Sequence, residues 1–321
     1  MVGLLKTWRD LRRKGVMGIN QRNADYILKY NQRQFFPLVD NKVLTKERAR
    51  ARGIHVPQAY AVVRTEREIA KIFEIIDAHD DFVIKPAHGA AGEGIVVISD
   101  RFDDLYRTVS GRLLSRNDLS HHLSNILTGM YSLGGAPDQA LIEYRVKSDP
   151  IFERISYSGV PDIRIIVLLG YPVMAMVRLP TQQSQGKANL HQGAIGVGID
   201  LAKGCTLQGS WMNRRITHHP DTRNMVDGVA VKHWDALLHQ AASCYEMCHL
   251  GYIGVDMVLD KEHGPMMLEV NARPGLNIQI ANNAGLAARC LQVEEQIRML
   301  KKQGAEENVQ DRVRFSQSLM D

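Results

Sequence analysis

The segment from Gly251 to Asn277, GYIGVDMVLDKEHGPMMLEVNARPGLN, constrains the fold more than any other part of the chain. Two apolar runs flank a short polar turn, a pattern typical of a β-hairpin. If the strands pair symmetrically about the turn Asp260 to Pro265, Asp256 lies opposite Glu269, with Cβ atoms about 5 Å apart. Because side chains alternate along a strand, Asn271 shares the face of Glu269.

The two acids interrupt strands that are otherwise apolar on both faces. Burying two carboxylates and an amide oxygen together is costly unless a cation lies between them. Ligands that are all oxygen favour magnesium, with manganese as a second choice. The alternative is an antiparallel pair whose acids face solvent. The pattern therefore predicts a divalent metal site made of Asp256, Glu269 and Asn271.

A second informative feature is Lys85, which ends an apolar run and stands beside a glycine-rich loop that leads into another apolar run. Glycines let backbone N–H groups close over phosphate oxygens. The loop glycines are Gly89, Gly92 and Gly94. The pattern is neither a Walker A sequence nor a GxGxxG that opens a helix. It predicts phosphate binding, and a plain long hairpin turn is the alternative.

The length and composition of the chain permit one substantial core or two smaller ones sharing a cleft, since 45% of its 321 residues are hydrophobic. Its sequence contains no run of about 18 apolar residues and no apolar signal-peptide core. Its four cysteines show no CxxC spacing, which disfavours zinc and suits a reducing compartment. We therefore expect a cytoplasmic protein, and the sequence gives no indication of its oligomeric state.

Three parts are expected along the chain: a helical region over 1–55, a subdomain over 56–143 and a second subdomain over 144–321. Within them, hydrophobic periodicity predicts strands at 59–63, 82–85, 95–99, 140–144, 163–169, 172–178, 252–259 and 265–271, and helices at 66–78, 119–131 and 234–249. The polar stretch 181–192 is a candidate lid. The tail after Gln292 is expected to be helical and peripheral.

The first 52 residues carry 13 Lys and Arg against 4 Asp and Glu. Such asymmetry indicates an acidic or phosphate-rich partner, and Trp8 beside Lys6 also allows weak contact with an anionic membrane surface. The alternative is a solvated helical face. Nucleic acid is disfavoured as a partner, because no aromatic and basic residues interleave.

In ordered sequence, these residues resemble the ATP-grasp superfamily, and within it the alpha-L-glutamate ligase-like proteins related to the ribosomal-protein glutamate ligase. A branch associated with sugar-transfer gene neighbourhoods is also similar. The matching motifs, within about 40–285, are Asn41-Lys42, Val56-Pro57, Phe82 to Pro86, the GAAGEG loop, Ile142-Glu143-Tyr144, Asp162-Ile-Arg164, Asn189-Leu-His191 and Glu269 to Gly275. The resemblance implies the α+β ATP-grasp fold, in which two α/β subdomains clasp ATP between antiparallel sheets.

The resemblance also implies roles for individual residues. Lys42 and Lys85 would contact the phosphates of ATP, Glu143 and Tyr144 would hold adenine, and Asp149 or Glu153 would take the ribose. Arg164 would steady the transferred phosphoryl group. The residues of the closing segment near the reacting centre would be Lys187, Asn189 and His191.

The implied activity is ATP-dependent ligation of a carboxylate to an amine through an acyl phosphate, with small molecules or peptides as substrates and glutamate suggested by the relatives. The alternatives are an ATP-binding scaffold without ligase activity and an ATP-grasp kinase that phosphorylates a hydroxyl. Two departures suggest a different substrate. Only about forty residues precede Lys42, and Arg273 replaces a smaller residue, so that its guanidinium could pair with a substrate carboxylate or phosphate.

Overall fold

The structure is a computed structural model that describes residues 9–89 and 92–319. Lys6 and Trp8, and the loop residues Ala90 and Ala91, lie outside this part. The chain forms two compact units. The smaller unit comprises Asp40–Glu47 and Val56–Val146, and the larger unit comprises Met1–Val39, Arg48–His55 and Lys147–Asp321. Among the described helices, none combines the length and apolar character that crossing a membrane requires.

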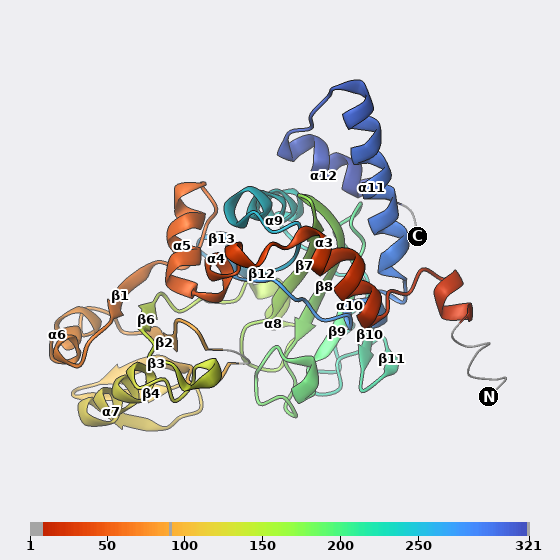
Figure 1. Cartoon of the computed structure of the whole chain (residues 1–321). Helices are drawn as coiled ribbons and strands as arrows, with labels where there is room; N and C mark the ends of the chain where they lie inside the picture. The colour runs from red at the N-terminus through yellow and green to blue at the C-terminus, as the bar shows by residue number, and fades with distance from the viewer. Residues whose placement is uncertain (1–8, 90–91, 320–321) are drawn as a thin grey trace, which may run out of the picture. The chain divides into compact units, whose positions relative to one another are not determined.

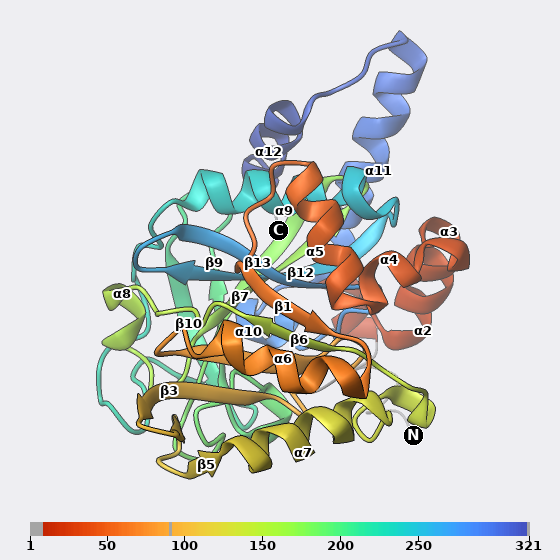
Figure 2. The same ribbon diagram turned by 90° about the vertical axis from the view of Figure 1, so that its left-hand side faces the viewer.

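The smaller unit is built on an antiparallel sheet in the order β1-β6-β2-β3-β4-β5. Its strands are β1 (Ala59–Val63), β2 (Phe82–Pro86), β3 (Val96–Phe102), β4 (Leu105–Thr108), β5 (Leu113–Ser115) and β6 (Ala140–Glu143). Its helices are α6 (Glu66–Ile76) and α7 (Arg116–Leu127), with the 3-10 turn η3 (Leu133–Gly135), while α5 (Lys42–Ala51) begins in this unit. The helices α6 and α7 lie beside each other in Figure 2.

The core of the smaller unit follows from helical spacing. Ile69, Ile72 and Ile76 of α6 recur every three or four residues, and all three are buried against the sheet. Helix α7 begins at a capping box in which Ser115 and Asp118 satisfy each other's backbone N–H groups. This cap sets the start of the helix three residues before the predicted Leu119. The predicted strands, helices and hairpin occur in the predicted order, but β4 and β5 were not predicted.

The larger unit is built on a seven-stranded antiparallel sheet in the order β11-β10-β9-β8-β7-β12-β13 (Figure 1). Its strands are β7 (Asp162–Leu168), β8 (Tyr171–Leu179), β9 (Ile195–Ile199), β10 (Thr206–Trp211), β11 (Arg214–Ile216), β12 (Tyr252–Asp260) and β13 (Gly264–Asn271). Its later helices are α8 (Pro150–Glu153), η4 (Leu190–Gln192), α9 (Trp234–Cys248), α10 (Ile278–Asn282), α11 (Leu286–Gln303) and α12 (Val309–Gln317).

The N-terminal segment of the larger unit consists of short helical turns. After helical residues 9–13, they are α2 (Ile19–Gln21), the π-helical η1 (Arg22–Ile27), α3 (Leu28–Tyr30), η2 (Arg33–Phe35) and α4 (Pro37–Asp40). Tyr26 and Ile27 pack with Ile166 and Met174 of the sheet in one apolar cluster, which also includes residues of α10 and α11. Residues 9–39 thus contain a series of helical turns, and they contribute to the core of this unit.

The expectation that the C-terminal tail is peripheral is wrong. Helix α12 packs against α9 and β8, and the side chain of Val313 is 1% exposed. Arg312, also buried, pairs with Glu246 of α9. The charged residues of the tail suggested a solvated helix, but in α12 the buried Val313 faces the rest of the unit, while the end of α11 is largely exposed.

Candidate active site

The predicted pairing of the two acids on β12 and β13 is confirmed, because Asp256 lies directly opposite Glu269. The amide nitrogen of Asn271 lies 3.3 Å from Asp256 Oδ2 and 3.3 Å from Glu269 Oε1. Every residue of β12 is buried, which agrees with its apolar pattern on both faces. The three side chains therefore converge on one face of a buried sheet rather than pointing into solvent.

Two arginines from neighbouring strands pair with the carboxylate of Asp256. Asp256 is only 2% exposed. Arg164 on β7 donates from Nε to Oδ1 at 2.7 Å and from Nη2 to Oδ2 at 2.6 Å, which is a bidentate pair. Arg178 on β8 donates from Nη2 to Oδ2 at 2.8 Å and also pairs with Asp162. An ion network thus connects β12, β7 and β8.

The network shifts the protonation equilibria of both aspartates. Burial raises the pKa of Asp256, but the guanidinium groups of Arg164 and Arg178 outweigh it and hold that pKa well below its ordinary value. Burial, together with the charge of Asp256, raises the pKa of Asp162 to about 7 against the opposing effect of Arg178. Unlike the two aspartates, Glu269 forms no ion pair with a cationic side chain among the described residues.

The smaller unit holds a separate buried ion cluster around Glu143, whose residue is 3% exposed. Lys85 Nζ on β2 lies 2.6 Å from Glu143 Oε1, and Lys46 Nζ on α5 lies 2.8 Å from Oε2. Burial raises the pKa of Glu143, but the two ammonium groups outweigh it and leave the pKa below its ordinary value. Two ammonium groups around one carboxylate leave a net positive charge beside the glycine loop, as phosphate binding requires.

The described part of the glycine loop is tied to its surroundings at both ends. Lys42 Nζ donates to the carbonyl oxygen of Gly89 at 2.5 Å, and a Cβ atom on Gly89 would lie 2.3 Å from Pro86 Cγ. Gly94 has φ of +70°, and its carbonyl oxygen is 3.0 Å from His122 Nε2. Glycine is therefore required at both positions, at one by a close contact and at the other by the left-handed backbone.

A histidine–aspartate pair stands beside this loop. His88 Nδ1 lies 2.6 Å from Asp138 Oδ1, and the side chain of Asp138 is fully buried while that of His88 is 42% exposed. Ser132 also donates to Asp138. The buried carboxylate therefore fixes the orientation of an accessible imidazole ring.

The residues expected to hold adenine and ribose are engaged within the protein. The backbone N–H of Tyr144 donates to the carbonyl oxygen of Gln58 at 2.8 Å. Asp149 caps α8 by accepting from the N–H of Ile151, and its carboxylate pairs with Lys232 at 3.0 Å. The adenine role of Glu143 and Tyr144 and the ribose role of Asp149 stay predictions.

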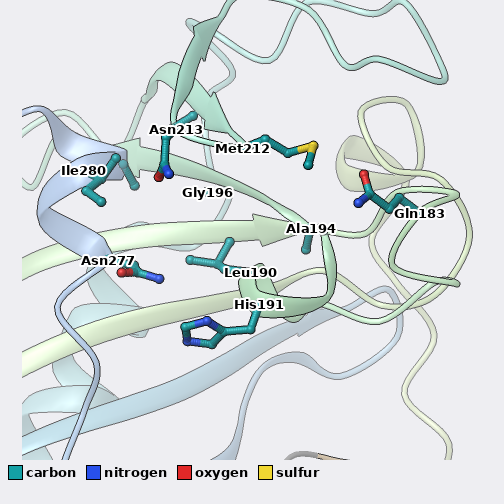
Figure 3. A pocket seen from close by; sticks show the side chains of 12 residues that line it. Gln183, Leu190, His191, Ala194, Gly196, Met212, Asn213, Asn277 and Ile280 are labelled. Atoms are coloured by element: carbon teal, nitrogen blue, oxygen red, sulfur yellow. The ribbon is translucent and has the colours of Figure 1, made fainter.

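The candidate lid begins with a buried turn in which Thr181 and Ser184 bond each other. Beyond it, Lys187 and His191 are exposed, and the side chain of Asn189 caps η4 by accepting from the N–H of His191. His191 lines a cavity of about 280 Å³, which Figure 3 shows together with Leu190. The catalytic roles expected of Lys187, Asn189 and His191 stay predictions.

The β12–β13 hairpin that carries Asp256 and Glu269 is called here the carboxylate hairpin. The N-terminal segment contacts the start of this hairpin and the loop that follows it. The buried Asn31 donates from Nδ2 to the carbonyl oxygens of Tyr252 and Ala272, at 2.7 and 2.9 Å, and accepts from the N–H of Tyr252. Arg273, expected to meet a substrate anion, is exposed and stacks over the ring of Phe36 at 4.5 Å. The substrate role of Arg273 stays a prediction.

Several side chains of these clusters were not singled out from sequence: Lys46, His88, Asp138 and Arg178. Asp162 appeared only as part of the Asp162-Ile-Arg164 motif, without a role of its own. Among the others, two carried a usable signal. Lys46 follows Lys42 by one helical turn, and Arg178 is a charge at the end of an apolar strand. His88 and Asp138 had no local signal, since they meet across 50 residues of chain.

The protein has two antiparallel sheets. One carries lysines beside a glycine loop, and the other carries acids paired with arginines. This combination is the one expected of the ATP-grasp class of proteins. Residues 21–295 match the model of the family described as sugar-transfer associated ATP-grasp. The match covers most of the chain, so this protein belongs to that family, and its α+β fold class and superfamily are as expected.

Several curated proteins and solved structures resemble this chain at 28% identity or less in the aligned parts. Probable alpha-L-glutamate ligases from Legionella pneumophila, strains Corby and Paris, are 28% identical over 144 residues, which is 44% of this chain and 36% of theirs. The chain thus spans little more than a third of the length of these relatives. The D-alanine–D-alanine ligase from Bacillus anthracis is 17% identical, with a TM-score of 0.46 over 83% of this chain and 70% of that chain. The ATP-grasp ligase PsnB, complexed with its minimal precursor, is 14% identical, with a TM-score of 0.45 over 84% of this chain and 63% of that chain.

Proposed function

We propose that the protein is an ATP-dependent ligase that joins a carboxylate to an amine. The observation that carries this proposal is the cluster of the buried Asp256 with the partly buried Glu269 and Asn271 and two arginines, which has no evident purpose in packing. Replacing a buried ion network with apolar residues is often neutral or stabilising, so its presence favours chemistry over stability. Membership of an ATP-grasp family supports the same reading.

The acid cluster fits a divalent cation of the magnesium type. The carboxylates of Asp256 and Asp162 are already paired with the guanidinium groups of Arg164 and Arg178. Glu269 is the acid left without an ion pair among the described residues, and Asn271 lies next to it. These two would hold the ion, with Asp256 beside them, and manganese is a second candidate. When bound, the ion would offset charge on the phosphates of ATP.

Lys42, Lys85 and the glycine loop would contact phosphates, and Arg164 and Arg178 would offset the charge that spreads over the γ-phosphoryl group during its transfer. The reaction would run in two steps. A carboxylate oxygen of the substrate attacks the γ-phosphorus and ADP leaves, which gives an acyl phosphate. An amine then attacks the acyl carbon, inorganic phosphate leaves and the amine loses a proton, which gives the amide. Glutamate is one candidate among the substrates.

The test measures ADP release by the full chain with ATP, magnesium and pooled amino acids or cell extract. Mass spectrometry should find a product lighter by one water than the sum of its two substrates. Lys85→Ala and Glu269→Gln should each lower ADP release at least a hundredfold. Lys71→Ala and Glu262→Gln, which change an exposed lysine and an exposed acid of the hairpin turn, are the matched controls.

Three outcomes contradict the proposal. Near-normal ADP release by Lys85→Ala or Glu269→Gln would show that these residues do not form the active site. A stable phosphorylated product without an amide indicates a kinase. ATP binding without substrate-dependent ADP release under any condition indicates a scaffold.

A further inference from the structure

The cavity of the larger unit has a chemistry distinct from that of the ion clusters. Its lining contains no Asp, Glu, Lys or Arg. The polar groups that line it are the side chains of Gln183, His191, Ser210, Asn213 and Asn277. Leu190 and Met212 add apolar surface (Figure 3). At about 280 Å³, it lies below the roughly 300–1,000 Å³ of a pocket for a drug-sized ligand. It therefore suits one small group.

Strand pairing places this cavity next to the arginines. Gly196, which lines the cavity, pairs with Arg178 on one side and with Ser210 on the other. Paired residues of an antiparallel ladder point to the same face and lie about 4.5–5.5 Å apart. The cavity therefore opens on the face that carries Arg178 and Asp256, one strand from Arg178.

The absence of a side chain at Gly196 creates part of this space. A Cβ atom there would lie 3.3 Å from Ala281 Cβ and 3.4 Å from Leu190 Cδ2. The φ angle of Gly196 is not in the left-handed region, so the backbone alone does not require glycine. Glycine here leaves room above the sheet rather than permitting a turn.

The polar groups of the lining are available to a ligand. The side-chain amides of Gln183, Asn213 and Asn277 and the ring of His191 form no hydrogen bond with any part of the chain that the structure describes. Figure 3 shows Asn213, Asn277 and His191 around a common space. Convergent donors and acceptors without partners are typical of a binding site for a polar ligand.

The turn between β10 and β11 forms one wall of the cavity. Met212 and Asn213 both have positive φ, +48° and +62°, which is the conformation that a tight two-residue hairpin turn requires. This turn places both residues on the cavity wall.

We propose that this cavity is a substrate subsite for an uncharged group bearing hydroxyl or amide functions. Burying a charged group there would leave it without a counter-ion among the lining residues, whereas a neutral group can take up the unpaired amides. Bound in this way, the group would hold the reacting end of the substrate over β8 and β7. The inference rests on the proposed ligase function, since it assigns one part of the same substrate.

The test compares three sugars of similar shape and different charge as probes of the full chain. They are N-acetylglucosamine, which is neutral, glucosamine, which is cationic, and glucuronate, which is anionic. Dissociation constants come from titrations followed by saturation-transfer difference NMR. N-acetylglucosamine should bind at least fivefold more tightly than either charged sugar.

Matched variants locate the binding. Asn213→Gly removes one amide at a backbone conformation that glycine tolerates, and it should weaken N-acetylglucosamine binding by about 3- to 10-fold. Asn277→Ala should have a similar effect. Asn283→Gly, the control, makes the same change at φ of +53° outside the cavity lining and should leave binding unchanged.

The proposal is overturned if none of the three sugars binds, if a charged sugar binds as well as the neutral one, or if Asn213→Gly behaves like Asn283→Gly. ADP release measured on the same preparations separates the two proposals. If Lys85→Ala abolishes ADP release while the sugar results fail, the subsite alone is rejected.

Discussion

Arg164 holds the carboxylate of Asp256 through two parallel hydrogen bonds, and Arg178 donates a third to the same group. Asp256 is therefore a structural partner of two buried guanidinium groups, whatever else it binds. Glu269, directly opposite Asp256, forms no ion pair with an arginine among the described residues. The two acids of one predicted metal site should consequently differ in what their removal does to stability.

Asp256→Asn should lower the free energy of unfolding by about 3 kcal/mol or more, because Arg164 loses its carboxylate partner and Arg178 loses one of its two. Glu269→Gln should change it by less than about 1 kcal/mol, because no ion pair is broken. Urea unfolding at pH 7 measures both, with Glu262→Gln as the exposed control. Equal losses for Asp256→Asn and Glu269→Gln would mean that Glu269 also belongs to the ion network.

The cluster around Glu143 predicts a dependence on acid pH. The pKa of Glu143 is lower in the folded chain than its ordinary value of 4.5. Such a group contributes stability above its unfolded pKa and loses it as pH falls through the folded pKa. Below about pH 4.5, the wild-type protein should therefore lose stability more steeply than Glu143→Gln, and urea midpoints between pH 7 and pH 3 measure this. Parallel pH profiles would contradict the prediction.

The same variant tests how far the lysines depend on their carboxylate. At pH 7, Glu143→Gln should be less stable than the wild type by about 3–5 kcal/mol, since Lys46 and Lys85 would face a neutral amide while buried. Glu153→Gln is the control, because it removes one exposed carboxylate that does not pair with Lys46 or Lys85. Its stability should stay close to that of the wild type.

His219 predicts a second pH dependence nearer neutrality. It is fully buried, and its ring bonds the carbonyl oxygen of Pro180 through Nε2 and the N–H of Asp221 through Nδ1. Burial lowers the pKa of His219 below its ordinary value of 6.5. The neutral ring is thus favoured in the folded chain, and its contribution is present above pH 6.5 and lost as pH falls from there through the folded pKa.

His219→Gln should therefore flatten the loss of stability as pH falls below about 6.5. Thermal unfolding at half-unit intervals of pH measures the effect. The exposed neighbour His218 provides the control, since His218→Gln should retain the wild-type profile. A wild-type slope in His219→Gln would assign the loss to other groups.

Packing of α12 predicts that the C-terminal tail contributes to stability. Val313→Ala should lower the free energy of unfolding by about 1–3 kcal/mol, because the side chain is 1% exposed between α9 and β8. Gln310→Ala, at an exposed position of the same helix, should be within about 0.5 kcal/mol of the wild type. Similar values for both would restore the interpretation of the tail as peripheral.

Alternation of side chains was enough to predict the opposed acids, yet the strands reach that pairing by a different path. Asp260 pairs with Gly264, and Met257 pairs with Met267, one residue short of the symmetric register. A bulge between Asp256 and Met257 then restores the offset, so that Glu269 rather than Leu268 faces Asp256. No feature of the hairpin sequence signals this bulge.

Contacts between distant segments account for most of what sequence could not predict. A lysine on a basic helix is normally solvated, and Lys46 is buried only because Glu143 meets it from β6. Arg178 likewise gains its role from Asp162 on β7 and Asp256 on β12, which are distant in sequence. The strands β9 to β11 were missed because glycine and polar residues interrupt their alternation.

The hydrogen bond between Asn31 and Ala272 can form only late during synthesis. It joins residues 241 positions apart, so Asn31 has no partner here until the end of β13 has left the ribosome. Loop closure over such a span is slow compared with local helix formation. The β12–β13 hairpin can pair locally before then, and the N-terminal segment docks onto its end afterwards.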